Sequence, residues 1–391
     1  MRIIALALAA TLAAGQPAPV ATTGQAAPVA TAGQAAPVAA DVRLTLPAPT
    51  GHDRIGTVSL HLVDASRGDP WVPAEKRREL MAQIWYPAAT VDGYRRADWV
   101  TPGIAAKLAP PGSGFTVPVT DGHIGAPAAP GRRPVVLFSP GLGMERTTAT
   151  ALVEDLASHG FVVVTIDHTH DANFVEFPDG RIATLALPVP TDETQEKAML
   201  AKALAVRVAD TRFVLDTLTA IARGRGPSVP RGLPRALDLN RVAMVGHSMG
   251  GATAAETMRV DRRVRAGLNL DGTFFGRVLD TGLDRPFLML GAATGDDGTW
   301  TRMWTKLRGP RHWLELQNTR HLSFTDLQTL LPQMNTPAEQ AEPLIGTIDG
   351  DRSIAVQRPY VRAFLDRYLR HRPGTLLTGP SPAYPEMRFP H

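Results

Sequence analysis

The chain has 391 residues, of which 44% are hydrophobic and 20% charged, and its net charge is +4. This length and apolar content are enough for one large domain with a buried core or for two small domains. The chain has no cysteine, which excludes disulfides, thiolate metal sites and cysteine nucleophiles. Its basic residues are scattered and form no block with interleaved aromatic residues, so nucleic-acid binding has no support.

The N-terminal segment is typical of an exported protein. Met1-Arg2 precede an apolar run from Ile3 to Ala14, as in a secretory signal peptide, and this run is too short to span a bilayer. Residues 15–41 then repeat a Gly-Gln-(Ala/Pro)-Ala-Pro-Val-Ala unit at a nine-residue period. Such an uncharged tract buries little surface and acts as a linker. We therefore predict a signal peptide over 1–14, a linker over 15–41, a secreted protein without stable membrane insertion, and one domain over 42–391.

The predicted domain begins with two segments that alternate apolar and polar residues. Gly56–Asp64 and Glu79–Tyr86 are expected to form half-exposed strands at a sheet edge. The Gly- and Pro-rich segment from Pro87 to Pro130 follows, with one short helix expected over Gly103–Leu108. This segment is long for a loop, and loops of this length often cover part of a functional site.

Six apolar runs alternate with helical patterns along the rest of the chain. This alternation indicates a parallel sheet covered on both faces. We therefore predict an α/β protein with the α/β-hydrolase fold, in which helices cover both faces of a mainly parallel eight-stranded sheet, and a C-terminal tail that runs over the surface. The six runs are Pro134–Ser139, Phe161–Ile166, Arg241–Gly246, Val264–Leu270, Pro286–Leu290 and Arg311–Leu316, and the helices are Thr147–His159, Thr191–Ala222 and Ser353–Arg370.

A candidate nucleophile, Ser248, lies in Gly246-His-Ser-Met-Gly250, between an expected strand and an expected helix. This spacing matches the G-x-S-x-G nucleophile elbow, in which the serine adopts unusual backbone angles and the glycines let strand and helix pass closely. The alternative is a Gly-rich strand-to-helix turn with an incidental serine.

His321 is the candidate base. A serine hydroxyl needs a base in hydrogen-bond reach, usually an imidazole oriented by a carboxylate. His321 follows the last expected strand on a short polar turn, and the order Ser, acid, His is the one that this fold uses. The alternative is a surface or helix-capping histidine. His247, inside the elbow, is expected to pack with its side chain directed away from the nucleophile.

Two positions compete for the acid. Asp296 and Asp297 follow the seventh expected strand, which is the commoner placement in this fold, but they lie in a Gly-rich polar loop. Asp271 follows the sixth strand and precedes Phe274-Phe275. Because burial of an unpaired carboxylate is expensive, this apolar setting favours Asp271 as the acid.

The remaining candidate groups are amide donors and a possible metal set. Acyl transfer needs preorganised N–H donors for the oxyanion, and we expect these from Met249 and from Leu142 in Pro140-Gly-Leu-Gly143. His168 and His170, with Asp167 and Asp171, have spacing that also suits a metal site. We favour a solvated loop or a substrate-pocket wall there, and expect neither metal nor cofactor.

Several stretches together resemble the plasma-type platelet-activating factor acetylhydrolase family and its bacterial esterase and lipase relatives, from Pro47 to Leu369. The resemblance implies an α/β-hydrolase fold, no metal cofactor and hydrolysis of carboxylic esters through an acyl-serine. It also implies the roles of nucleophile, acid and base for Ser248, Asp271 and His321, and of oxyanion donors for Leu142 and Met249. The matching stretches are Gly56–Asp64 with Asp69-Pro-Trp71, Arg78–Met81 with Ile84–Pro87, Phe138–Gly143, Leu156–Phe161, Gly246–Thr253 and Asp271.

Two departures from the family concern the acyl pocket. Met249 stands where the eukaryotic members have Phe, and Asp271 is followed by Gly-Thr-Phe-Phe instead of an Ala-Trp-type sequence. The phospholipid substrate is therefore not transferred. We predict a monomeric serine hydrolase of small-molecule or lipid esters. The alternatives are a polyester hydrolase or lipase with a wide cleft, and a catalytically silent binding protein of the same fold.

Overall fold

The structure, a computed structural model, describes residues 41–391. The predicted signal peptide and the predicted linker, apart from Asp41, lie outside the described residues. Within the described part of the chain, no helix is both long enough and apolar enough to cross a bilayer.

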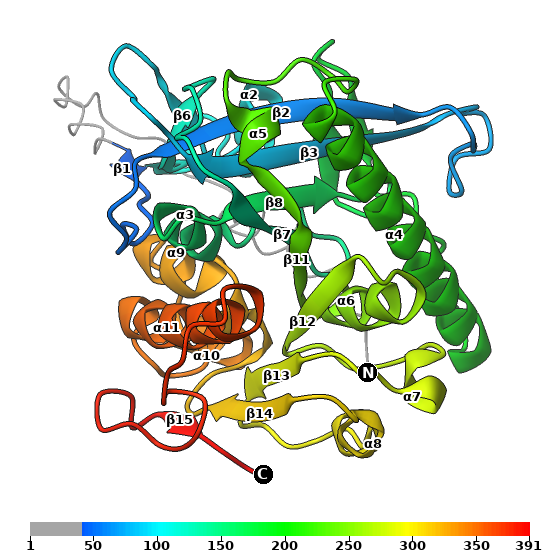
Figure 1. Ribbon diagram of the computed structural model, residues 1–391, viewed down its shortest axis with the longest axis vertical. Coiled ribbons are helices and arrows are strands. Elements are labelled where there is room, and N and C mark those ends of the chain that lie inside the picture. Colours follow the sequence, from blue (N-terminus) through cyan, green and yellow to red (C-terminus); the bar gives the residue numbers. More distant parts are fainter. Residues whose placement is uncertain (1–40) are drawn as a thin grey trace, which may run out of the picture.

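A mixed sheet of eleven strands runs through residues 41–391 (Figure 1). The strand order is β15-β14-β13-β12-β11-β7-β8-β3-β2-β6-β4, and the six neighbours from β14 to β8 are parallel. The strands of this sheet are β2 (Ile55–Asp64), β3 (Arg78–Pro87), β4 (Arg96–Asp98), β6 (Val119–Ile124), β7 (Arg133–Ser139), β8 (Val162–Asp167), β11 (Leu237–His247), β12 (Val264–Leu270), β13 (Phe287–Ala292), β14 (Arg311–Leu316) and β15 (Met387–Arg388). Two small pairs lie apart: β1 (Val42–Arg43) with β5 (Phe115–Thr116), and β9 (Phe174–Glu176) with β10 (Ile182–Thr184).

The α/β sheet predicted from the sequence is confirmed, but it is larger than eight strands. All eight expected strands lie in it, and β4, β6 and β15 extend it. The expectation that β2 and β3 lie at a sheet edge was wrong, and so was the expected half exposure of β3, whereas β2 does alternate between buried and more exposed residues. β3 is almost entirely buried between β8 and β2, and β6 and β4 continue the sheet beyond β2. These short added strands have no apolar run that periodicity could detect.

Alternate side chains of the central strands enter two different cores. Val135 and Leu137 of β7 face one apolar cluster with residues of α4 (Glu193–Ala222) and α6 (Met249–Val260). Val136 and Phe138 face the other, with α3 (Thr150–Ser158) and α11 (Gly350–Leu369). This period of two is the geometry of a strand covered on both faces, and Figure 1 shows the two helical layers on opposite sides of the sheet.

The remaining helices are short. They connect the strands or pack around the carboxyl ends of the sheet. The helix expected over Gly103–Leu108 is present as α2, and the chain from His321 onward forms a 3-10 turn followed by α9. These elements are α2 (Pro102–Leu108), α5 (Leu233–Ala236), α7 (Val278–Thr281), α8 (Thr299–Lys306), η2 (His321–Phe324), α9 (Leu327–Gln333) and α10 (Ala338–Ile345).

A buried carboxylate ties the start of α3 to the segment that follows His321. Asp326 accepts hydrogen bonds from the amides of Thr150 (2.8 Å) and Ala151 (3.0 Å), which are the first two residues of α3. It also lies 3.2 Å from the Trp99 indole nitrogen, which donates to it. These bonds satisfy amides that have no acceptor within the helix. Burial nevertheless raises the pKa of Asp326 to about 6.

This raised pKa predicts a pH dependence of stability. Between its ordinary value of 3.8 and about 6, Asp326 keeps its proton in the folded protein but loses it on unfolding. The free energy of unfolding should therefore fall as the pH rises through this window, by on the order of 3 kcal/mol from this group. Asp326→Asn should lower stability at every pH and remove this part of the slope. Urea titrations from pH 4 to 7 would measure both effects, with exposed Asp98→Asn as the charge-matched control. An unchanged slope in Asp326→Asn would contradict the assignment.

Candidate active site

Ser248 occupies a sharp turn between β11 and α6. Its φ is +55°, a left-handed conformation that costs energy for a residue with a side chain. The flanking glycines permit the close passage of strand and helix. A Cβ at Gly250 would lie 1.9 Å from the Ser139 carbonyl oxygen, and one at Gly246 would lie 2.1 Å from the Gly250 carbonyl. The elbow geometry predicted for Gly246–Gly250 is therefore present.

The sheet order brings the predicted groups to this turn. β11 lies between β7 and β12, and Gly246 is in register with Ser139 on one side and with Asn269 on the other. The turn after β7 and the acid-bearing turn after β12 thus flank the serine. The loop after β14 completes the group, as expected where the carboxyl ends of parallel strands meet.

Ser248, His321 and Asp271 form a continuous hydrogen-bonded chain. His321 Nε2 lies 2.9 Å from Ser248 Oγ, and His321 Nδ1 lies 2.7 Å from Asp271 Oδ2. The other carboxylate oxygen of Asp271 accepts from the Ala292 amide at 2.8 Å. Since Nδ1–H donates to the carboxylate, Nε2 of the neutral ring is free to accept the serine proton, which is the arrangement of a serine nucleophile and its base.

The rival acids lie in a different environment. Asp296 accepts the amides of Gly298, Trp300 and Thr301, and Asp297 accepts the amide and hydroxyl of Thr299. Asp297 also accepts the Thr273 hydroxyl at 2.6 Å. Both carboxylates therefore hold the start of α8, while the structure places Asp271 against the imidazole.

A buried ion pair binds the turn that carries Leu142. Arg207 of α4 donates to the carbonyl oxygens of Pro140 (2.5 Å) and Gly141 (2.9 Å), and it forms a two-pronged pair with Asp171. The Gly143 amide donates to the Asp171 carbonyl at 3.1 Å. With these carbonyls directed toward Arg207, the turn is fixed beside Ser248, and Leu142 lines the same cavity as the serine.

Met249, the other predicted donor, is the first residue of α6 and lines that cavity too. Amides in the first turn of a helix have no acceptor within the helix and meet the positive end of its dipole. The two predicted donors therefore belong to residues that line the same cavity as Ser248.

His247 buttresses the base. Its Nε2 donates to the His321 carbonyl oxygen at 2.9 Å, and the two rings lie 4.7 Å apart between centroids. Burial, and then the neighbouring His321, hold the pKa of His247 well below its ordinary value, so this ring is neutral. His247 therefore packs against the base and bonds its backbone, which agrees with the packing role predicted for it.

The residues weighed as a metal set have separate partners. Asp167 pairs with Arg146, Asp171 pairs with Arg207, and His168 lies between Asp210 and the Ser139 hydroxyl, at 3.0 Å from each. Burial, and then Arg207, lower the pKa of His168. The expectation that His168 and His170 lie in a solvated loop or in the pocket wall was wrong. Both are buried, and His168 belongs to an ion network beneath the oxyanion turn.

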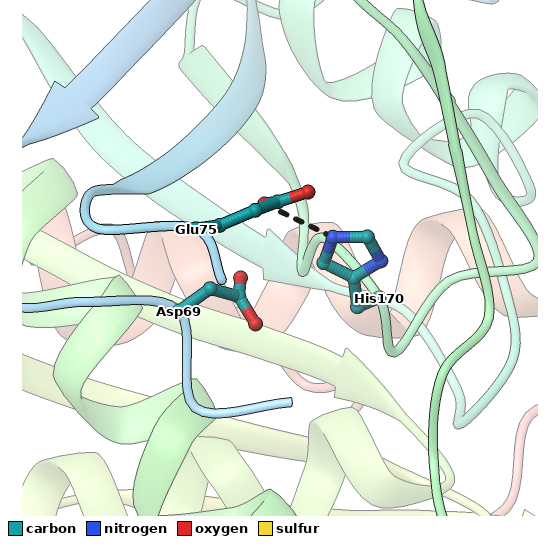
Figure 2. A group of neighbouring side chains, drawn as sticks. All are labelled: Asp69, Glu75 and His170. Atoms are coloured by element: carbon teal, nitrogen blue, oxygen red, sulfur yellow. Dashed lines mark hydrogen bonds and ion pairs between the residues drawn. The ribbon is translucent and has the colours of Figure 1, made fainter. Parts of the chain in front are cut away.

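A second cluster of possible ligands lies in the same network. Asp69, Glu75 and His170 each bring one donor atom within 4.8 Å of the others (Figure 2). Both Asp69 oxygens are already bonded, Oδ2 to Arg78 at 2.6 Å and Oδ1 to the amides of Trp71 and Val72. His170 Nε2 lies 3.2 Å from Glu75. These contacts tie the β2–β3 loop to the segment after β8.

Sequence reasoning missed the buried arginines. Arg207 and Asp210 lie on the same face of α4 as Ala203 and Val214, and all four are buried. Since residues three and four positions apart share a helix face, two charged residues within this apolar stripe were a detectable signal of buried ion pairs.

The site opens into a cavity of about 740 Å³. One part of its wall is apolar, with Leu142, Met144, Met199, Leu200 and Phe275, and another part is polar, with Glu196, Asp296, Glu315 and Arg320. None of the lining residues comes from the segment Pro87–Pro130. That segment instead supplies α2, β5 and the sheet strands β4 and β6.

Comparison with known protein families decides the identity of the chain. Residues 112–373 match the family described as platelet-activating factor acetylhydrolase, isoform II. The chain belongs to this family. The resemblance predicted from the sequence is thereby confirmed, and the chain is a member of a family of serine ester hydrolases.

Individual relatives agree with this membership. A probable 1-alkyl-2-acetylglycerophosphocholine esterase of Arthroderma benhamiae is 30% identical over 282 residues, which cover 66% of this chain and 66% of that protein. A platelet-activating factor acetylhydrolase of Cavia porcellus is 27% identical over 60% of this chain and 57% of its own length. The chain thus spans less than two thirds of these curated relatives.

A solved structure shows the same fold over nearly the whole described chain. The ferulic acid esterase from Streptomyces cinnamoneus matches with a TM-score of 0.77 and 40% identity, and the match covers 89% of this chain and 99% of that one. The fold is therefore the α/β-hydrolase fold, as predicted.

The assignment of the catalytic acid can be tested by substituting Asp271 and its rival Asp297 separately. Asp271→Asn should lower kcat for an activated ester by about 10⁴-fold, because the amide cannot hold the imidazole in the required tautomer. Asp297→Asn, which alters a carboxylate at the rim of the same cavity, should retain nearly full kcat. Steady-state kinetics on p-nitrophenyl acetate would show the difference. The reverse pattern would assign the acid to Asp297.

The support of the oxyanion turn can be tested separately. Arg207→Lys keeps a cation beside Asp171 but cannot donate to both carbonyls in a fixed fork, so we expect kcat to fall about 100-fold with KM nearly unchanged. Arg78→Lys is the matched control, since Arg78 is equally buried but binds Asp69, Asp210 and the Thr169 carbonyl. Similar losses of kcat in both variants, in step with their loss of stability, would show that Arg207 has only a structural role.

Proposed function

We propose that the chain hydrolyses carboxylic esters by acyl transfer to Ser248 and then to water. The observation that carries the proposal is the continuous chain from Asp271 through His321 to Ser248 at the wall of a large cavity. His321 Nε2 takes the proton as Ser248 Oγ attacks the ester carbonyl, and Asp271 stabilises the imidazolium that forms. The amides of Met249 and Leu142 then donate to the oxyanion of the tetrahedral intermediate.

The same groups complete the cycle. Collapse of the first intermediate breaks the bond to the alcohol, which leaves with the proton from His321 and creates acyl-Ser248. Water then loses a proton to His321, attacks the acyl carbon and forms a second oxyanion at the same amides. When this intermediate collapses, His321 returns its proton to Ser248 Oγ and the acid is released.

The cavity supports an ester with a bulky apolar part. Its volume of about 740 Å³ falls in the range that encloses a drug-sized molecule, roughly 300–1,000 Å³. Three methionines line it, together with Leu142 and Phe275, and methionine adapts well to aromatic groups. With the 40% identity to a ferulic acid esterase, these features favour esters of aromatic acids as the substrate class. We further propose that the protein is secreted and monomeric.

Active-site labelling tests the chemistry. Phenylmethylsulfonyl fluoride should add one sulfonyl group to Ser248, located by peptide mass mapping, and Ser248→Ala should show no adduct. Folded wild-type protein without an adduct would favour a silent binding protein of the same fold.

A substrate panel tests the class. Methyl ferulate should be cleaved with a higher kcat/KM than a short-chain 2-acetyl phospholipid or a polyester film. Preference for the phospholipid would favour a platelet-activating factor acetylhydrolase, and release of products from the film would favour a wide-cleft polyester hydrolase.

Export has its own measurement. Mature protein recovered from culture medium should begin after Ala14. A full-length product that stays inside the cells would contradict secretion.

A further inference from the structure

A second cavity, of about 240 Å³, lies at the other end of the sheet from Ser248. Its lining comes from the start of β7, from β11, from the residue after α3 and from the residues just after α11. β7 runs from Arg133 at this cavity to Ser139 beside the elbow, a path of about 20 Å at the usual rise of a strand. The lining residues are Arg132, Arg133, Pro134, His159, Arg241, Arg370 and Arg372.

Two of the arginines approach one point, which the Asp53 carboxylate also borders. A Cβ placed on Gly160 would lie 3.1 Å from Arg370 Nη2, 3.3 Å from Arg133 Nη1 and 3.4 Å from Asp53 Oδ2. Gly160, whose φ is +88°, has no side chain to fill this space. Two guanidinium groups from distant parts of the sequence therefore share a small volume, although like charges repel each other at close range.

Neighbouring carboxylates do not neutralise the cluster. Arg132 and Arg241 share Asp238, and Arg370 and Arg372 share Asp366. Even with Asp53 counted, five arginines face three aspartates. Among the described residues Arg133 forms no ion pair, and its buried Nε has no hydrogen-bond partner. A buried donor without an acceptor is costly, and an anion in the cavity would supply the acceptor.

His159 is a neutral member of the lining. Its Nε2 accepts from Arg362 Nη1 at 2.7 Å, and an arginine can only donate. The proton of the neutral ring is therefore on Nδ1. Burial, and then Arg362, lower the pKa of His159, which keeps the ring neutral.

We propose that this cavity binds a phosphate-type oxyanion, either as free phosphate or as the headgroup phosphate of a lipid. Guanidinium groups pair with phosphate oxygens through two parallel bonds. Donors that approach from β7, from β11 and from the residues after α11 suit a tetrahedral anion better than a planar carboxylate. The site is separate from the Ser248 cavity and does not depend on the proposed function.

Thermal unfolding at constant ionic strength tests the site. Sodium phosphate should raise the Tm of the full protein saturably, while sodium chloride at the same ionic strength should not, because general screening acts equally for both salts. The variant Arg132→Gln/Arg133→Gln/Arg372→Gln should lose at least about 10-fold in apparent phosphate affinity, given the strength of charged hydrogen bonds. Its unchanged hydrolysis of p-nitrophenyl acetate would show that it is folded.

A charge-matched control distinguishes phosphate binding in this cavity from a general effect of net charge. Arg223, Arg225 and Arg262 are exposed residues outside this cavity, and Arg223→Gln/Arg225→Gln/Arg262→Gln should keep the phosphate response of the wild type. The absence of a saturable phosphate effect, an equal effect of chloride, or an equal loss in this control would each overturn the proposal.

Vesicles distinguish the two sources of phosphate. Sedimentation is measured with phosphatidylcholine vesicles that contain phosphatidylglycerol and with vesicles of phosphatidylcholine alone. A lipid headgroup is the ligand if binding needs the anionic lipid, is displaced by phosphate and is lost in the cavity variant. A phosphate response without vesicle binding would identify the soluble anion. Vesicle binding that survives in the cavity variant, together with no phosphate response in the wild type, would overturn the site.

Discussion

The close passage of β11 and α6 at Ser248 is the constraint on which the rest of the site depends. Any side chain at Gly250 would collide with the carbonyl of Ser139, at the end of the neighbouring strand. The same contact that makes the turn tight therefore sets the distance between the serine and the turn that carries Leu142. Once β7, β11 and β12 are in register, the nucleophile, the oxyanion turn and Asp271 are fixed relative to one another by backbone geometry.

The buried ions beneath the site have a different role from the apolar cores. Taking Arg207, Asp171, Arg78 and Asp210 out of water costs much of what their attraction returns. Burial raises the pKa of Asp210, but the Arg78 ion pair and the His168 hydrogen bond together lower it by more than burial raises it. The pKa of Asp210 therefore lies below its ordinary value, and the network is ionised. Its hydrogen bonds reach the carbonyl oxygens of Pro140, Gly141 and Thr169 and the hydroxyl of Ser139. We interpret the network as a device for positioning the oxyanion turn, while the two cores supply the stability.

The sequence alone predicted those parts of the structure that local patterns determine. Six apolar runs and two segments of alternating apolar and polar residues identified eight strands of the main sheet, and the burial cost of a carboxylate beside Phe274 pointed to Asp271. What it missed depends on contacts between distant segments. Strand β6 has no apolar run and exists because β2 and β4 pair with it, and Asp171 gains its role only through Arg207, 36 positions away. The roles of these side chains become visible only once the sheet order is known.

The two ends of the main sheet bear on how the protein behaves in concentrated solution. One end is β4, whose three residues include the exposed, charged Arg96 and Asp98, and the other is β15, two residues long with exposed Arg388. An unpaired strand edge is a template for another chain, and short charged strands remove most of that template. An eleven-stranded sheet can in this way keep its backbone donors and acceptors from recruiting a neighbouring molecule, so that high local concentration need not lead to fibrous association.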